Sequence, residues 1–144
     1  MELAATGNVA AIFLTMSNEL VTSKILKCPA DTGRQYGTNF TAGFGSQNIS
    51  YFVGLDASDE NPASILVGDD NFELDDEKVK PGVLELWTNM PVAWSRERHQ
   101  FKGNIALSDG TVHTMTTSEL KNAMASQYKS QWGAFTNRFR FAIP

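Results

Sequence analysis

Two histidines and one cysteine are the residues of this sequence best suited to chemistry. They are His99, His113 and Cys28. A cysteine beside a histidine can act as a nucleophile, and several such side chains around one point can hold a metal ion. His99 precedes one strand of an expected hairpin and His113 lies on the other strand, so the sequence shows no ligands closing around an ion. Nothing local pairs Cys28 with either histidine, and no Gly-x-Ser-x-Gly motif is present.

Structural roles are therefore expected for these residues, and we expect a protein that is not an enzyme and holds no metal through them. Cys28 stands before Pro29 in a strand-like run, which is typical of a small apolar residue in the core. A single cysteine cannot form an intrachain disulfide. The His99 imidazole is expected to hydrogen-bond backbone near the hairpin or the incoming loop.

Acidic side chains form a second candidate site, because oxygen ligands from two loops could hold calcium. The candidates are Asp56, Asp59, Glu60, Asp69 and Asp70. The run from Asp56 departs from the helix-loop-helix calcium pattern, with Asn61 where glycine belongs and Val67 where the closing glutamate belongs. Solvated turn carboxylates are the favoured interpretation, so no cofactor is expected and calcium remains the alternative.

The elements around these residues begin with a predicted hairpin at Asp109-Gly110, which lies between two alternating runs. A two-residue type I′ turn needs positive φ at both central residues, which glycine adopts freely and aspartate tolerates. This turn would place Leu107 opposite Val112 and Ile105 opposite Thr114. Two sides of the ribbon would follow, one with Ile105, Leu107 and Val112 and the other with Asn104, Ala106, His113 and Met115.

An N-terminal helix is predicted over residues 8–20, where apolar residues recur at helical spacing. Asn8 or Thr6 could cap its start. The residues expected to pack this helix on a sheet are Val9, Ile12, Phe13 and Met16. A second helix is predicted over residues 118–130, where Leu120, Ala123, Met124 and Tyr128 share one face.

The remaining segments are expected to be strands, turns and one long loop. Short extended segments or strands are predicted at residues 25–28, 49–55, 64–67, 72–74, 83–88 and 137–143, turns at 68–71, 75–78 and 80–82, and a loop at 31–46. One amphipathic helix followed by mostly antiparallel strands favours an α+β fold with the helix laid across one face of the sheet. Residues 1–144 are expected to form a single domain.

Composition supports an ordinary globular domain. The 144 residues are 42% hydrophobic and 19% charged, with a net charge of −4 from 16 acidic and 12 basic residues. Nucleic acid and anionic membrane surfaces are not expected as partners, because the basic residues are few and scattered. No apolar run approaches the roughly 18 residues of a membrane-spanning helix.

The hairpin region also carries a resemblance to a known family. A histidine, nine intervening residues and then Asp-Gly occur at His99, Asp109 and Gly110, with Gly103-Asn104 between them. This pattern resembles the C-terminal signature of pilin-like proteins with a prepilin-type leader, the pseudopilins of type II secretion and type IV pilus-like systems. Other segments resemble the same group in the same order: residues 16–20, 25–31, 48–57 and 65–71.

The resemblance implies a pilin-like fold and a bacterial structural protein, the head of a pseudopilus or pilus-like filament subunit. Its implied partners are other pilin-like subunits and the assembly machinery, and its implied location is the periplasmic or cell-envelope side, anchored in the inner membrane. A pseudopilin needs a leader and a hydrophobic helix, neither of which is found here, so we expect the anchor to precede Met1. A soluble protein that never had an anchor would show the same sequence features.

An extracytoplasmic binding module for a peptide, a glycan or calcium is the alternative function. Trp87, Trp94 and Trp132 could line such a site. Aromatic residues in a small domain are more often part of the core. Two tryptophans together on the surface over a groove would favour the binding module.

Overall fold

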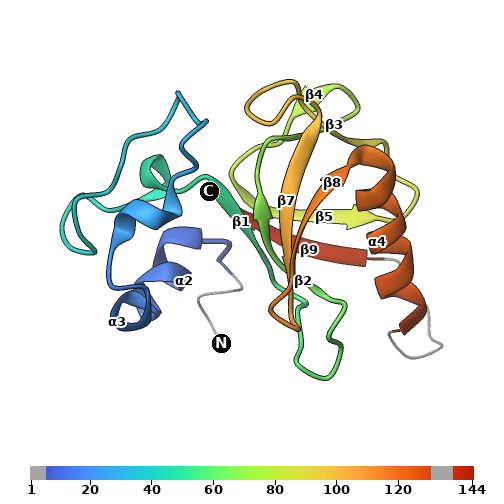
Figure 1. Cartoon of the computed structure of the whole chain (residues 1–144), viewed down its shortest axis with the longest axis horizontal. Coiled ribbons are helices and arrows are strands. Elements are labelled where there is room, and N and C mark those ends of the chain that lie inside the picture. Colours follow the sequence, from blue (N-terminus) through green and yellow to red (C-terminus); the bar gives the residue numbers. More distant parts are fainter. Residues whose placement is uncertain (1–5, 131–137) are drawn as a thin grey trace.

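Residues 6–130 and 138–144 are described by the computed structural model, and they form an α+β fold (Figure 1). The strands are β1 (Tyr51–Gly54), β2 (Ile65–Asp69), β3 (Phe72–Leu74), β4 (Glu77–Lys78), β5 (Gly82–Trp87), β6 (Val92–Trp94), β7 (Lys102–Leu107), β8 (Val112–Thr116) and β9 (Arg138–Ile143). The helices are α2 (Val9–Thr15), α3 (Ser17–Leu20), α4 (Thr117–Ser130) and the 3-10 turns η1 (Ser23–Leu26) and η2 (Ser46–Asn48). Within these ranges, no helix has the length and apolar character needed to cross a membrane.

The main sheet has six strands in the order β5-β9-β1-β2-β7-β8, and every neighbouring pair is antiparallel. A smaller antiparallel sheet follows the order β4-β3-β6. The mainly antiparallel α+β architecture expected from the sequence is therefore confirmed, as are the strands near residues 83–88 and 137–143.

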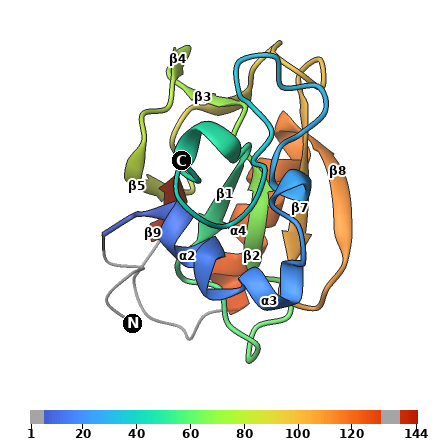
Figure 2. The same cartoon turned by 90° about the vertical axis from the view of Figure 1, so that its left-hand side faces the viewer.

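Both faces of the main sheet are covered, as Figure 1 shows with the N-terminal helices on one side and α4 on the other. Figure 2 looks onto the first face, where α2 and α3 stand in front of β1 and β2. The larger core lies between the sheets and α4: Phe52, Ile65, Phe72, Leu86, Val92, Trp94, Ile105, Met115, Leu120, Met124, Phe139, Phe141 and Ile143. A separate cluster lies under the N-terminal segment: Val9, Ala10, Phe13, Leu26, Ile49 and Ala142.

The N-terminal helix packs on the sheet as expected, but it is shorter than predicted. Asn8 caps it by accepting a hydrogen bond from the Ala11 amide at 3.0 Å, and the helix ends at Thr15. The Thr15 hydroxyl donates to the Ile12 carbonyl at 2.7 Å, a local bond that competes with helix propagation. Val9 and Phe13 are buried and Ile12 is partly buried, whereas Met16 lies between the two short helices and is 37% exposed, so its packing role was predicted wrongly.

The segment after these helices is also helical rather than extended. Thr22 accepts a hydrogen bond from the Lys24 amide and begins the 3-10 turn η1. The predicted extended segment at residues 25–28 is therefore wrong for its first half, whereas Lys27, at the end of the turn, has extended dihedral angles. The Thr22 hydroxyl occupies the Lys24 amide, which favours the start of a helical turn over a strand at this point.

The β7–β8 hairpin exists, but its register is shifted by one residue from the prediction. Ile105 pairs with His113 and Ala106 with Val112. The Gly110 amide donates to the Leu107 carbonyl, and Gly110 has positive φ (84°) while Asp109 does not. This is a type I turn followed by a left-handed glycine, the three-residue hairpin, rather than a type I′ turn.

The shifted register leaves the predicted sides of β7 unchanged and moves the β8 residues to the opposite side, because one residue of slip moves a side chain to the other face. Ile105 and Met115 lie on the core side, and Val112 is 67% exposed. The two-residue type I′ geometry occurs elsewhere, at Asp75-Asp76 between β3 and β4, where both residues have positive φ (55° and 62°).

The predicted turn at residues 68–71 is wrong as well. Gly68 and Asp69 belong to β2, and the chain then leaves the main sheet to begin β3 of the smaller sheet at Phe72. The C-terminal helix agrees with the prediction within one residue, and Leu120 and Met124 are buried on its inner side.

Candidate functional site

The segment Asp69-Asp70-Asn71 connects the two sheets and is buried instead of solvated. Its residues are 0%, 4% and 2% exposed, respectively. The Asp69 Oδ2 atom accepts hydrogen bonds from the Asn104 backbone amide at 2.7 Å and from its Nδ2 at 3.0 Å. Asn71 Nδ2 donates to the carbonyls of Glu97 and Lys102. The segment therefore fixes both ends of the loop at residues 95–101.

Asp70 belongs to a buried ionic network, which we call the arginine network: Asp31, Arg34, Asp70 and Arg98. Arg34 donates two hydrogen bonds to Asp70, from Nη1 to Oδ1 at 3.1 Å and from Nη2 to Oδ2 at 2.6 Å, and one to Asp31 at 3.0 Å. Arg98 donates to Asp70 from Nη2 and to the Ser50 carbonyl from Nη1. Two-pronged contacts of this kind are the strong form of the arginine–carboxylate pair.

The arginine network controls the charge of Asp31. Burial by itself raises the pKa of this carboxyl. Hydrogen bonds from the Ser50 hydroxyl at 2.7 Å and from Arg34, with the nearby charge of Arg98, outweigh it and lower the pKa to about 2. Asp31 is therefore ionised in the folded protein at neutral pH.

The loop at residues 95–101 has an unusual backbone. Arg98, Gln100 and Phe101 all have positive φ (61°, 52° and 62°), a region that non-glycine residues adopt only when their surroundings hold them there. Arg98 is held by the arginine network, and the Phe101 amide donates to the Ser95 carbonyl. The loop thereby presents His99 toward the end of β2.

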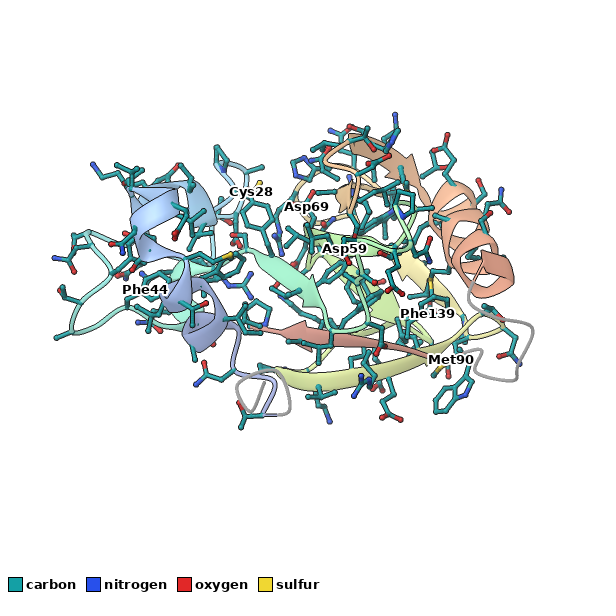
Figure 3. All side chains as sticks on the ribbon, turned by 90° about the horizontal axis from the view of Figure 1, so that it is seen from below. Cys28, Phe44, Asp59, Asp69, Met90 and Phe139 are labelled. Atoms are coloured by element: carbon teal, nitrogen blue, oxygen red, sulfur yellow. The ribbon has the colours of Figure 1, made fainter. Side chains whose placement is uncertain are left out.

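His99 meets Cys28 and Asp69, an arrangement the sequence did not predict. His99 Nε2 lies 3.4 Å from Cys28 Sγ and 3.3 Å from Asp69 Oδ2. Figure 3 labels Cys28 on the N-terminal segment and Asp69 on the sheet, close to each other where these parts meet. Cys28 is buried as expected, but the expectation that the His99 imidazole bonds to backbone is replaced by these two side-chain contacts.

Cys28, Asp69 and His99 form the one group of three such side chains found in the described part of the chain with donor atoms within 4.8 Å of one another. In a nucleophilic triad the nucleophile and the carboxylate bind different nitrogens of the imidazole. Here both approach the same Nε2 atom, so the carboxylate does not orient the ring for proton transfer from sulfur. The geometry matches a set of ligands better than a catalytic triad.

Tyr51 lies on β1 beside this group. Burial, together with the nearby Cys28 and Asp69, raises the pKa of its phenol to about 12. The phenol therefore stays protonated at neutral pH and adds no charge to the group.

The signature hairpin residues divide into two sets. His99 and Asn104 face Asp69 directly, and the Thr114 hydroxyl donates to Asn104 Oδ1 at 2.7 Å. Gly103, Asp109 and Gly110 have roles in the backbone. A Cβ on Gly103 would lie 2.4 Å from the Trp94 ring, and Asp109 accepts hydrogen bonds from the Thr111 amide and hydroxyl, which lower the pKa of its carboxyl.

The calcium candidates are not gathered in one place. Asp56 is paired with Arg140, which donates to it from its backbone amide at 2.8 Å and from Nε at 2.9 Å. Asp59 is exposed on the loop before β2, whereas Asp69 ends that strand. Asp70 is neutralised by two arginines. The other histidine, His113, also lies outside the group formed by Cys28, Asp69 and His99. Its ring is exposed and contacts Thr111 at 3.0 Å.

The tryptophans do not form a surface pair in the described part of the chain. Trp94 is 1% exposed and packs edge-on against Phe72, whereas Trp87 is 43% exposed. Trp132 lies outside the described residues.

A hollow of about 430 Å³ beside the arginine network is lined by charged side chains, but Lys78 and Glu97 within it are already paired with each other.

The fold and the site define an antiparallel α+β domain whose N-terminal segment is joined to the sheet through buried polar side chains. In a comparison with known proteins, no family model, no curated protein and no solved structure matches the chain.

Proposed function

We propose that this chain is the globular head of a pilin-like structural subunit, in a type II secretion pseudopilus or a type IV pilus-like filament. The order of the resembling segments supports the proposal, as does the position of the N-terminal helical segment across one face of an antiparallel sheet. The assignment of the finer pilin-like fold belongs to this proposal as well.

The observation that carries the proposal is the apolar character of the N-terminal segment on its outer as well as its inner side. Val9 and Phe13 are buried against the sheet. Further along, apolar side chains are exposed: Leu14 (39%), Met16 (37%), Val21 (84%) and Ile25 (52%). Large apolar side chains exposed within so short a stretch of chain are typical of a surface that another molecule covers.

In the proposed filament, copies of this segment cover one another. A membrane-embedded helix on the N-terminal side would hold each head at the cell envelope, and the heads would present sheet edges and loops to their neighbours. The mechanism is assembly, with no chemical step. Other pilin-like subunits and the assembly machinery are the partners in this proposal.

Cysteine cross-linking of the full-length protein in its own cells tests the proposal. In a Cys28→Ser background, Leu14→Cys and Val21→Cys should give disulfide-linked dimers and higher species in the membrane and in filaments sheared from the cell surface. Glu77→Cys, on the exposed strand β4, is the matched control and should give few. Recovery of the protein from the soluble fraction alone, with no cross-links at either position, would overturn the proposal.

A further inference from the structure

The distances from His99 to Cys28 and from His99 to Asp69 fit two edges of a tetrahedron around a metal ion, and the donor atoms of all three side chains lie within 4.8 Å of one another. Zinc bonds of about 2.3 Å to sulfur and about 2.05 Å to nitrogen or oxygen place sulfur and nitrogen roughly 3.5 Å apart, and nitrogen and oxygen roughly 3.3 Å apart. The observed separations are 3.4 Å from Sγ to Nε2 and 3.3 Å from Nε2 to Oδ2. The side chains need little movement to bind one ion.

The charge of Asp69 has no permanent counter-ion among the described residues. This carboxylate is 0% exposed and its one ion-pair partner there is His99, which carries a charge only when protonated. Its neighbour Asp70 instead has two arginines. Buried charges in proteins are paired or coordinate metals. The Asp69 carboxylate is therefore available to coordinate a metal ion.

One oxygen of Asp69 is held in place and the other is unsatisfied. Oδ2 accepts the two bonds from Asn104, an arrangement that orients a ligand carboxylate. Oδ1 is buried and has no hydrogen-bond partner among residues 6–130 and 138–144. The His99 Nε2 atom has one proton or one lone pair, so it cannot satisfy Cys28 and Asp69 at the same time, whereas a cation between them can.

We propose that Cys28, His99 and Asp69 bind a divalent transition-metal ion of the zinc type. Thiolate, imidazole and carboxylate are ligands that suit zinc. A thiolate and a carboxylate together neutralise its two charges. The His99 side chain is 28% exposed, which gives the ion a path from solvent and leaves room for water as the fourth ligand.

The ion joins three parts of the chain that are far apart in sequence: the end of the N-terminal segment, the end of β2 and the loop at residues 95–101. The arginine network joins the same three parts, so the site reinforces an existing connection. Its role is structural, and the inference does not depend on the proposed filament.

Metal content and cobalt spectroscopy of the purified chain test the site. After incubation with Zn²⁺ and desalting, the wild-type protein should retain one equivalent, and Co²⁺ should give a thiolate-to-cobalt charge-transfer band. Cys28→Ser and His99→Gln should each weaken Zn²⁺ binding by more than about 100-fold, since even indirect partners of ligands cost 10–100-fold. Cys28→Ser should also abolish the charge-transfer band.

His113→Gln is the matched control, because it removes the other histidine, whose ring is exposed and contacts Thr111. It should bind Zn²⁺ and Co²⁺ as the wild type does. Circular dichroism of each variant without metal establishes that it is folded. Asn104→Ala removes a side-chain hydrogen bond that orients Asp69 and should weaken Zn²⁺ binding by about 10–100-fold. A folded wild-type protein that retains no Zn²⁺, or that loses its Zn²⁺ on His113→Gln but not on His99→Gln, would overturn the proposal.

Discussion

Asp69 and Asp70 are adjacent residues with different partners. Successive side chains in an extended chain point in opposite directions, so Asp70 reaches Arg34 and Arg98 while Asp69 reaches Asn104 and His99. Their sequence, Gly68-Asp69-Asp70-Asn71, is typical of a solvated turn. It was interpreted as one because sequence alone does not reveal that two arginines from distant segments arrive at the same point.

The pKa of Asp31 predicts a pH dependence of stability. Its folded-state pKa of about 2 lies below the ordinary value of 3.8, so the unfolded chain binds the proton first as the pH falls. The stabilising contribution of the ionised carboxyl is present above about pH 4 and is lost as the pH approaches 2, and it amounts to roughly 2 kcal/mol.

Urea unfolding of the wild type and Asp31→Asn at several pH values between 2 and 5 measures this contribution. The gap in unfolding free energy should narrow by about 2 kcal/mol toward the acidic end, because the variant cannot titrate at this position. A gap that stays constant over the whole range would contradict the assignment.

At the scale of elements, turn chemistry explains where the sequence was informative and where it was not. The hairpin at Asp109-Gly110 was predicted correctly, but two-residue and three-residue turns both accept this dipeptide. The choice between them set the side on which each β8 residue lies relative to β7. Asp75-Asp76 lies in the turn predicted at residues 75–78 and adopts the type I′ geometry without a glycine, but the prediction did not specify the type of turn.

The helical elements were predicted with similar limits. Apolar spacing identified the helices, because Val9, Phe13, Leu120 and Met124 face the core. It did not place the break after Thr15, which depends on a side-chain bond to the backbone. Residues 31–46 form a long loop as predicted, except that the 3-10 turn η2 begins at Ser46. No sequence pattern indicated that Asp31 and Arg34 in this loop would be anchored inside the protein.

Two glycines of the signature hairpin should respond differently to alanine. Gly110 has positive φ and open space around its Cα, so Gly110→Ala should cost about 1 kcal/mol through backbone strain alone. Gly103→Ala places a Cβ against the Trp94 ring and should cost about 1–3 kcal/mol through overpacking.

Urea unfolding gives both free energies, and tryptophan fluorescence of the folded state separates the causes. The emission spectrum should change in Gly103→Ala and stay as in the wild type in Gly110→Ala. Equal spectra in both variants would mean that the Trp94 contact does not limit the residue at position 103.

At the scale of the whole molecule, the candidate site is a product of topology. Cys28 and His99 are 71 positions apart, and they meet only because the N-terminal segment crosses the end of β2 while the loop at residues 95–101 turns back toward it. Sequence reasoning considered the Cys–His pair and set it aside for lack of local support. A pair this remote leaves no local pattern, so three-dimensional structure was required to find it.

The attachment of the N-terminal segment to the sheet gives a test at this scale. Phe13 is 4% exposed and Leu14, its neighbour, is 39% exposed. Phe13→Ala should lower the free energy of unfolding by about 3–5 kcal/mol, because it opens a cavity between α2 and the sheet. Leu14→Ala should change it by no more than about 0.5 kcal/mol, and comparable losses in the two variants would contradict the packing described.

Strand β9 contains the last residues of the sheet to be synthesised, yet it lies between β5 and β1. A nascent chain therefore cannot complete this sheet until residues 138–143 have left the ribosome. Until then β1 lacks a partner on one edge, and β5 has no neighbouring strand to pair with in this sheet. Products of premature termination would keep those edges open to proteases and chaperones. A chain in which this sheet is complete has therefore been translated at least as far as residue 143.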